Sequence, residues 1–321
     1  MQKRTMPRVI AHRGASGYLP EHTLEAKALA YGMGADYLEQ DVVLTRDSVP
    51  IVMHDIHLDT VSDVAKKFPG RARSDGRYYA IDFSWEEVSQ LRVTERFNPR
   101  DGKAVFEKRF PVGVGNFRIP TLAEEIQFIQ GLNRSTGRNV GIYPEIKQPR
   151  FHENEGRDIT AIVLDVLLEA GYRTKADACY VQCFEPPSLQ RLRKEFGCQL
   201  KLIQLMDGKA SQRAMESESS LTEYLKDVAT YADGVGPELK PVLSSLRFGS
   251  KTDGAGDGAF VRVAHACGLE VHPWTCRADQ LPAGQESFEK LHRVLFDLQV
   301  DAVFSDFPDQ SRQQFLACRD A

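Results

Sequence analysis

The sequence predicts an α/β fold, a (β/α)8 barrel of the TIM type, because eight short apolar runs alternate with amphipathic segments along 321 residues. Alternating strands and helices are typical of a parallel sheet, and eight such units favour a closed barrel over an open doubly wound sheet. Neither a GxGxxG motif nor a P-loop motif follows the first strand, which argues further against a nucleotide-binding sheet. We therefore expect residues 1–321 to form a single barrel domain.

Each unit consists of an apolar run, interpreted as a strand, and the helical pattern that follows it. Gly32 and Gly34 suit the end of the first helix, since glycine is common just beyond a helix C-terminus. A short extra run at 49–54 belongs to the second unit, and the run at 234–236 is the weakest of the strands. The strands are expected at 8–13, 37–44, 140–147, 179–184, 200–205, 234–236, 270–275 and 302–305. The helices are expected at 23–33, 122–132, 159–170, 188–196, 221–231, 259–266, 288–298 and 309–317.

Residues 57–120 interrupt this alternation. They are rich in Arg, Lys, Asp and Gly and carry no long apolar period. A loop of this length inside a compact domain is usually functional or has its own structure. We expect a small subdomain inserted after the second strand, at the active face of the barrel.

Composition limits the class of protein and its partners. Hydrophobic residues make up 42% and charged residues 27%, which is ordinary for a soluble globular domain. The net charge of −4 argues against a nucleic-acid partner, which usually requires a basic face, but allows a local basic pocket for one phosphate. No run of 18 apolar residues exists, so we expect no membrane insertion. Oligomeric state is not readable.

The N-terminus and the cysteines bear on the cellular compartment. Residues 1–7 contain no apolar signal core and no small-residue cleavage site, so the protein is either cytoplasmic or a mature form whose signal was removed. The cysteine spacings match no zinc motif, and we expect free structural thiols, although pairing cannot be read from sequence. The six cysteines are Cys179, Cys183, Cys198, Cys267, Cys276 and Cys318.

Acidic side chains occur in two of the predicted strands, and barrel active sites lie at the carboxyl ends of strands. Glu39 and Asp41 are two residues apart, so both side chains leave the same face of their strand. Paired carboxylates in an apolar run must be neutralised, and a divalent cation such as Ca²⁺ or Mg²⁺ prefers such oxygen ligands. Glu145 could supply a third carboxylate from the next core strand. The alternative is that these are surface charges on a frayed strand.

Two histidines lie at the ends of predicted strands. His12 is near the end of the first strand and His54 ends the short extra one. Histidine exchanges protons near neutral pH, and two histidines beside a bound cation would suit a general acid and a general base. The alternative is that each is a hydrogen-bonded core histidine.

Two cationic side chains accompany the carboxylates. Arg13 and Lys147 lie next to the candidate acid/base and metal residues in sequence. A carboxylate-held cation with Arg and Lys suits a phosphoryl group, since Arg can grip two phosphate oxygens and Lys offers a point charge. Arg13 could instead pair with a ligand carboxylate, and both roles can coexist.

Five further residues are weaker candidates. Trp274 could form an aromatic wall over a small ligand or belong to the core, and Gln182 could bond substrate or a neighbouring carboxylate. His272 and Asp306 could support the site from behind or be structural. His22 stands at a helix start, where capping is the simpler explanation.

Several separated motifs resemble the glycerophosphodiester phosphodiesterase family, in the same order and over nearly the whole chain. The similarity is greatest to the bacterial periplasmic branch, which stretches 63–69 and 75–83 of the insertion also resemble. The motifs are HRGASGYLPEHT at 12–23, YLEQDV at 37–42, VMHD at 52–55, YPEIK at 143–147 and FSDFP at 304–308.

The resemblance implies a TIM-type barrel with an inserted subdomain and hydrolysis of glycerophosphodiesters to sn-glycerol 3-phosphate and an alcohol. It also implies a periplasmic location and a metal that is usually Ca²⁺, or Mg²⁺ in some relatives. The family reaction is often drawn through a cyclic phosphate formed by the glycerol 2-hydroxyl. Many members have Asn where this chain has His22. By this resemblance the acid/base pair is His12 and His54, the metal ligands are Glu39, Asp41 and Glu145, and the phosphate contacts are Arg13 and Lys147.

Two other functions stay open at this point. A phospholipase D-type enzyme of the same superfamily, acting on lysolipids or sphingomyelin, would use the same residues. A non-catalytic surface protein that binds a phosphodiester would keep the pocket, but it would be expected to lose at least one of these histidines or carboxylates. The preferred alcohol group and the identity of the metal cannot be read from the sequence.

Overall fold

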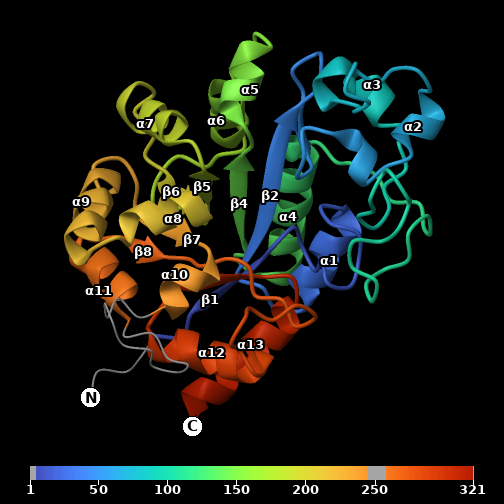
Figure 1. Cartoon of the computed structure of the whole chain (residues 1–321). Helices are drawn as coiled ribbons and strands as arrows, with labels where there is room; N and C mark the ends of the chain where they lie inside the picture. The colour runs from blue at the N-terminus through green and yellow to red at the C-terminus, as the bar shows by residue number, and fades with distance from the viewer. Residues whose placement is uncertain (1–4, 245–257, 321) are drawn as a thin grey trace.

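The computed structural model describes residues 5–244 and 258–320, and in this part of the chain eight parallel strands form a barrel (Figure 1). Hydrogen-bonded neighbours follow the order β8-β7-β6-β5-β4-β2-β1-β9. The short strand β3 (Pro50–Val52) pairs antiparallel with β2. The eight parallel strands are β1 (Arg8–Ala11), β2 (Tyr37–Leu44), β4 (Gly141–Ile146), β5 (Tyr180–Cys183), β6 (Lys201–Met206), β7 (Gly234–Pro237), β8 (Glu270–Val271) and β9 (Ala302–Ser305).

The barrel closes between β8 and β9. The Asp301 amide donates to the Val271 carbonyl at 3.0 Å, and the Phe304 amide donates to the Pro273 carbonyl at 3.0 Å. The predicted strand at 270–275 is regular only to Val271, since Pro273 has no amide hydrogen to give to a ladder. The predicted (β/α)8 barrel is confirmed.

Helices follow the strands and cover the outside of the barrel (Figure 1). Helix α4 runs four residues beyond the predicted end, until Gly137 adopts a left-handed conformation (φ 70°) and terminates it. Outside residues 57–120, three short helices of the described chain were not predicted, because each is too short for an apolar period: α5 (Pro149–Asn154), α8 (Gly208–Ala214) and α10 (Leu239–Leu243). The longer helices are α1 (Leu24–Gly32), α4 (Leu122–Thr136), α6 (Ile159–Glu169), α7 (Pro186–Lys194), α9 (Glu218–Val228), α11 (Ala259–Ala266), α12 (Phe288–Asp297) and α13 (Pro308–Asp320).

The segment 57–120, called here the inserted segment, lies beyond the arrowhead of β2 in Figure 1. It packs an apolar cluster, distinct from the main barrel core, that includes Leu58, Phe83, Leu91 and Val93 together with Ile51 of β3. This cluster fixes the segment at the carboxyl end of the strands. Its helices are η1 (Leu58–Thr60), α2 (Val64–Lys67), η2 (Ala80–Asp82) and α3 (Trp85–Val88).

The cysteines agree with a further expectation from sequence. The six cysteines are all free thiols, and all but Cys267 are buried. None of the described helices combines the length and the apolar character needed to cross a membrane.

A buried ion pair joins α1, β2 and α4 directly behind the acidic strand. The Lys27 ammonium donates to the Glu125 carboxylate at 2.6 Å and to the backbone carbonyl of Glu39. The Gln40 side-chain amide donates to the same Glu125 oxygen at 2.8 Å. Lys27 and Glu125 are fully buried, so their ion pair is shielded from solvent.

Replacing Lys27 with Met is expected to lower the free energy of unfolding by about 3–5 kcal/mol, because it leaves the Glu125 carboxylate buried without its cation. Urea denaturation measures the loss. The double variant Lys27→Met/Glu125→Leu should recover most of it, since neither charge then remains. A double variant as unstable as the single one would contradict this explanation.

Candidate active site

A pocket of about 120 Å³ opens at the carboxyl ends of the strands, and all eight site residues predicted from sequence line it. Gln182, a weaker candidate, also lies in its wall. Three apolar residues, which were not predicted from the sequence, complete the lining. The lining consists of His12, Arg13, Glu39, Asp41, His54, Glu145, Lys147, Gln182, Phe184, Leu205, Trp274 and Phe304.

Strand register places the acidic residues at one level of the barrel. Asp41 of β2 is the Cα partner of Glu145 in β4, and Glu145 is the partner of Gln182 in β5. Glu39, two residues before Asp41, has its side chain on the same face of β2. Glu39 and Asp41 are each 1% exposed and Glu145 is 6% exposed, so they are not surface charges on a frayed strand.

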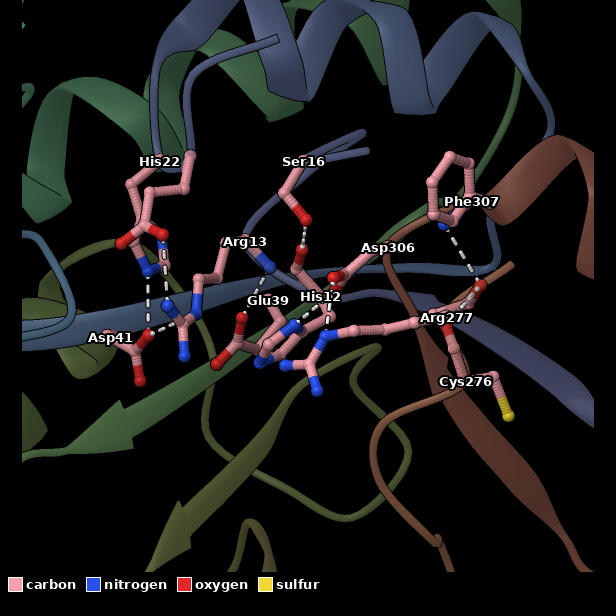
Figure 2. A network of polar contacts seen from close by, with 12 residues as sticks. His12, Arg13, Ser16, His22, Glu39, Asp41, Cys276, Arg277, Asp306 and Phe307 are labelled. Atoms are coloured by element: carbon pink, nitrogen blue, oxygen red, sulfur yellow. Dashed lines mark hydrogen bonds and ion pairs between the residues drawn. The ribbon is translucent and has the colours of Figure 1, made fainter. Parts of the chain in front are cut away.

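Arg13 and Lys147 lie among these carboxylates. The backbone amide of Arg13 donates to a Glu39 oxygen at 2.6 Å, and its guanidinium Nε lies 3.5 Å from Asp41 Oδ2 (Figure 2). Lys147 Nζ lies 2.8 Å from Glu145 Oε1 and 3.4 Å from Asp41 Oδ1. Arg13 therefore does pair with an acidic residue, as one alternative anticipated.

The buried carboxylates of Glu39, Asp41 and Glu145 are called here the acidic cluster. His22 contacts this cluster and does not cap helix α1. Its Nε2 lies 2.7 Å from Asp41 Oδ2 (Figure 2). The cap of α1 is Thr23, whose hydroxyl accepts the Ala26 amide at 3.2 Å, so the capping explanation for His22 is wrong. One ligand atom each from His22, Glu39 and Asp41 lies within 4.8 Å of the others. Glu145 is not in this group of three; its carboxylate pairs with Lys147.

The cluster has the properties of a cation site. Burial and the neighbouring Asp41 carboxylate raise the pKa of Glu39 well above its ordinary value. Burial likewise raises the pKa of Glu145 to about 8, opposed by Lys147. Among the described residues, Gln182 Oε1 is buried without a hydrogen-bond partner, and so is Asp41 Oδ1 apart from its ion-pair contact with Lys147. Unsatisfied oxygen ligands and mutually repelling carboxylates fit a hard divalent cation.

His12 is oriented by an aspartate. The Nδ1 atom of His12 lies 2.6 Å from Asp306 Oδ1 (Figure 2). Burial raises the pKa of Asp306, but His12 and two arginines outweigh it and hold the pKa well below its ordinary value. The carboxylate therefore stays ionised and accepts the Nδ1 proton, which leaves Nε2 of His12 for proton transfer. Asp306, a weak candidate from sequence, thus supports a site histidine.

His54 has the same arrangement. Its Nδ1 atom lies 2.6 Å from Asp55 Oδ1, the carboxylate of the next residue. Burial, with the cations Arg13 and Lys147, lowers the pKa of His54 to about 4, so the ring is neutral at physiological pH. Burial and the neighbouring Arg13 also lower the pKa of His12. Each histidine has an ionised aspartate at Nδ1, which leaves Nε2 to take a proton as a general base or, once protonated, to give one as a general acid.

The chain turn after β1 brings these groups together at the cost of unusual backbone angles. Arg13 and His22 both have positive φ, 59° and 62°, although neither is glycine. Gly14 (φ 86°) packs so closely that a Cβ would lie 2.9 Å from the Ala26 backbone. Such conformations concentrate at functional sites, where the surrounding structure maintains them.

Four residues form the apolar part of the pocket lining: Phe184, Leu205, Trp274 and Phe304. Trp274 donates its indole N–H to the Gly236 carbonyl at 2.8 Å, which fixes the ring next to Phe184 at a centroid distance of 5.7 Å. His272 is not in the pocket. Its ring bonds Tyr143 Oη and Glu270 inside the barrel.

Comparisons with known proteins agree with this geometry. The sequence model of the glycerophosphoryl diester phosphodiesterase family matches residues 12–310. A glycerophosphodiester phosphodiesterase of Haemophilus influenzae is 44% identical, with 94% of this chain and 87% of that protein covered. One of Treponema pallidum is 38% identical, with 94% and 89% covered.

Solved structures share the fold. A crystal structure from Silicibacter pomeroyi has a TM-score of 0.72 at 23% identity, covering 98% of this chain and 95% of that one. A phosphodiesterase of Oleispira antarctica, solved in complex with the product sn-glycerol-3-phosphate, has a TM-score of 0.62 at 21% identity and 96% coverage of both chains.

Proposed function

This chain belongs to the glycerophosphoryl diester phosphodiesterase family, and we propose on that basis that it hydrolyses glycerophosphodiesters with small polar alcohols to sn-glycerol 3-phosphate and the free alcohol. Glycerophosphocholine and glycerophosphoethanolamine are the expected substrates. The observation that carries the proposal is the pocket itself, in which two aspartate-backed histidines share a lining with three buried carboxylates and two cations.

The substrate phosphate is a monoanion whose transition state gains negative charge on its nonbridging oxygens. Arg13 and Lys147 supply positive charge in a buried pocket, where electrostatic stabilisation of the transition state by each cation is stronger than in water. Each already neighbours Asp41, so they are held in place before substrate arrives. We assign them to the phosphate oxygens.

The two histidines transfer protons at opposite ends of the reacting phosphorus. One, as a neutral imidazole, takes the proton of the attacking hydroxyl at Nε2, and the other, as an imidazolium, gives its Nε2 proton to the leaving alkoxide. His12 and His54 enter the pocket from different strand ends, after β1 and after β3, which suits attack and departure on opposite sides.

The acidic cluster would hold a divalent cation. We propose Ca²⁺ foremost, with Mg²⁺ as the alternative, on Glu39, Asp41 and Glu145, with His22 adjoining. Bound there, the cation supplies Lewis-acid stabilisation to a phosphoryl oxygen.

Trp274→Ala is expected to raise KM for glycerophosphocholine by about tenfold, because an apolar wall of this size contributes on the order of 1–3 kcal/mol to binding. The change in kcat should be smaller, since the indole donates to a backbone carbonyl and not to a reacting group. Steady-state kinetics separate the two constants. A fall in kcat with unchanged KM would contradict the assignment.

The substrate class is tested by comparing kcat/KM on glycerophosphocholine and on lysophosphatidylcholine at equal calcium. Because the pocket measures about 120 Å³, we expect the lipid-free substrate to be preferred by at least tenfold. Preference for the lysolipid would favour a phospholipase D-type enzyme. Binding of glycerophosphocholine with no turnover would favour a non-catalytic binding protein.

A further inference from the structure

We propose that the inserted segment positions both histidines through two arginines: Arg96 holds the aspartate behind His54, and Arg109 holds the aspartate behind His12. The inference rests on the proposed function, because the histidines must transfer protons for their orientation to matter. It gives the inserted segment a role in the reaction itself, and neither arginine has a signal in the sequence that would have identified it.

The first set of contacts runs from Arg96 through Asp55 to His54. Asp55 divides its two oxygens between different partners: Oδ1 lies 2.6 Å from His54 Nδ1, and Oδ2 accepts from Arg96 Nη1 at 2.6 Å. Thr60, also in the inserted segment, donates to the same Oδ2 at 2.8 Å. With Oδ2 held by two donors, the carboxylate is fixed with Oδ1 against the imidazole.

Arg96 is also connected, through Glu21, to Arg13, the residue proposed to contact the phosphate. The Nη2 and Nε atoms of Arg96 donate to the two oxygens of Glu21, at 2.5 and 3.0 Å. Glu21 in turn accepts from Arg13 Nη1 at 3.0 Å. One guanidinium from the inserted segment therefore supports a histidine on one side and the proposed phosphate ligand Arg13 on the other.

The second set of contacts runs from Arg109 through Asp306 to His12 and has the same arrangement as the first. Asp306 presents Oδ1 to His12 Nδ1 at 2.6 Å, and its Oδ2 accepts from Arg109 Nη2 at 2.7 Å. Arg277 donates to the same Oδ2 at 2.8 Å (Figure 2). Asp279 also holds Arg109, accepting from its Nε at 2.8 Å and from the same Nη2 at 3.1 Å.

The Arg96–Asp55 and Arg109–Asp306 contacts differ from ordinary surface ion pairs because they are buried. The side chains of Arg96 and Arg109 are only 14% and 4% exposed. Arginine pairs of this kind are strong and directional, whereas exposed pairs contribute little. Each aspartate has one oxygen on a histidine and the other on an arginine from the same inserted segment, and this repetition on two independent strand ends is the core of the inference.

The test compares Arg96→Gln and Arg109→Gln with a matched control, Arg73→Gln. Arg73 lies in the same segment and binds Asp82 through two nitrogens, but it contacts neither histidine-backing aspartate. Removing an orienting partner typically costs 10–100-fold in activity, so we expect kcat on glycerophosphocholine to fall by about that factor in both test variants. KM should stay unchanged in Arg109→Gln, and Arg73→Gln should match the wild type.

Double variants distinguish positioning from a loss of folded protein. If Arg109 acts through Asp306, Arg109→Gln should lower kcat little further in an Asp306→Asn background. The same holds for Arg96→Gln in an Asp55→Asn background. A purely structural effect would add in full and would lower the melting temperature. Proton NMR gives a readout without turnover, because the Nδ1–H resonances of His12 and His54 should shift in the matching arginine variant and not in Arg73→Gln.

Two results would overturn the inference by different routes. An active wild type whose Arg96→Gln and Arg109→Gln variants keep full kcat, or whose double variants are additive, overturns the inference and leaves the proposed function standing. A folded, calcium-loaded wild type without hydrolytic activity overturns the proposed function, and the inference falls with it.

Discussion

Replacing His12 or His54 with Asn is expected to lower kcat by about 10²- to 10⁴-fold, the usual contribution of a positioned proton-transfer group. Asparagine retains a side-chain donor at the place of Nδ1, so the hydrogen bond to Asp306 or Asp55 can persist. It lacks the Nε2 atom that would exchange the proton. The variant therefore removes the chemistry while preserving the local packing.

The matched control is His265→Asn on α11. His265 also pairs with an aspartate, with Nε2 2.9 Å from Asp301 Oδ2, but it is partly exposed and does not line the pocket. Its replacement should leave kcat at the wild-type value. Full kcat in a correctly folded His12→Asn or His54→Asn variant would contradict the proposed acid/base pair.

Removing one carboxylate of the acidic cluster is the second large expected effect. Asp41→Asn should lower kcat by about 10²-fold or more, because Lewis-acid stabilisation by a cation is worth several kcal/mol and each 1.36 kcal/mol is tenfold in rate. Asp41 is the best choice because its two oxygens face Lys147 on one side and Arg13 and His22 on the other.

Metal removal provides the companion measurement. EDTA treatment of the wild type should abolish turnover, and added Ca²⁺ should restore it and raise the melting temperature through ligand linkage. In Asp41→Asn the calcium-dependent rise should shrink or vanish. Glu153→Gln on α5 is a matched acidic control, since Glu153 pairs with Arg191 and does not line the pocket. Turnover that persists in EDTA, or an Asp41→Asn variant with full activity, would contradict a cation at this cluster.

Much of the fold could be predicted because the barrel depends on local signals. Strand and helix periods, and glycines such as Gly32 near the end of α1, are local properties of the sequence. The eight predicted pocket residues converge because each lies in a barrel strand or shortly after a strand, and the parallel register of β2, β4 and β5 brings their acidic residues to one level. The helices α5, α8 and α10 escaped prediction because five to seven residues are too few for a period.

The supporting contacts could not be predicted because they join distant parts of the chain. Arg109 meets Asp306 across 197 residues, and Arg96 meets Glu21 across 75. Neither arginine differs in local sequence from the other basic residues of the inserted segment. His22 was misinterpreted for a related reason: its neighbour Thr23 caps the helix, and only the tertiary fold brings His22 to Asp41.

The most direct test of the central claim is identification of the products formed from glycerophosphocholine by the calcium-loaded wild type. Enzymatic assay of sn-glycerol 3-phosphate and choline in the same sample measures both sides of the bond that breaks. We expect the wild type to form the two products in equal amounts. His12→Asn and His54→Asn should form them only at the residual rate left by the expected loss of about 10²- to 10⁴-fold in kcat. Release of phosphocholine and glycerol, or no products from a folded, metal-loaded chain, would contradict it.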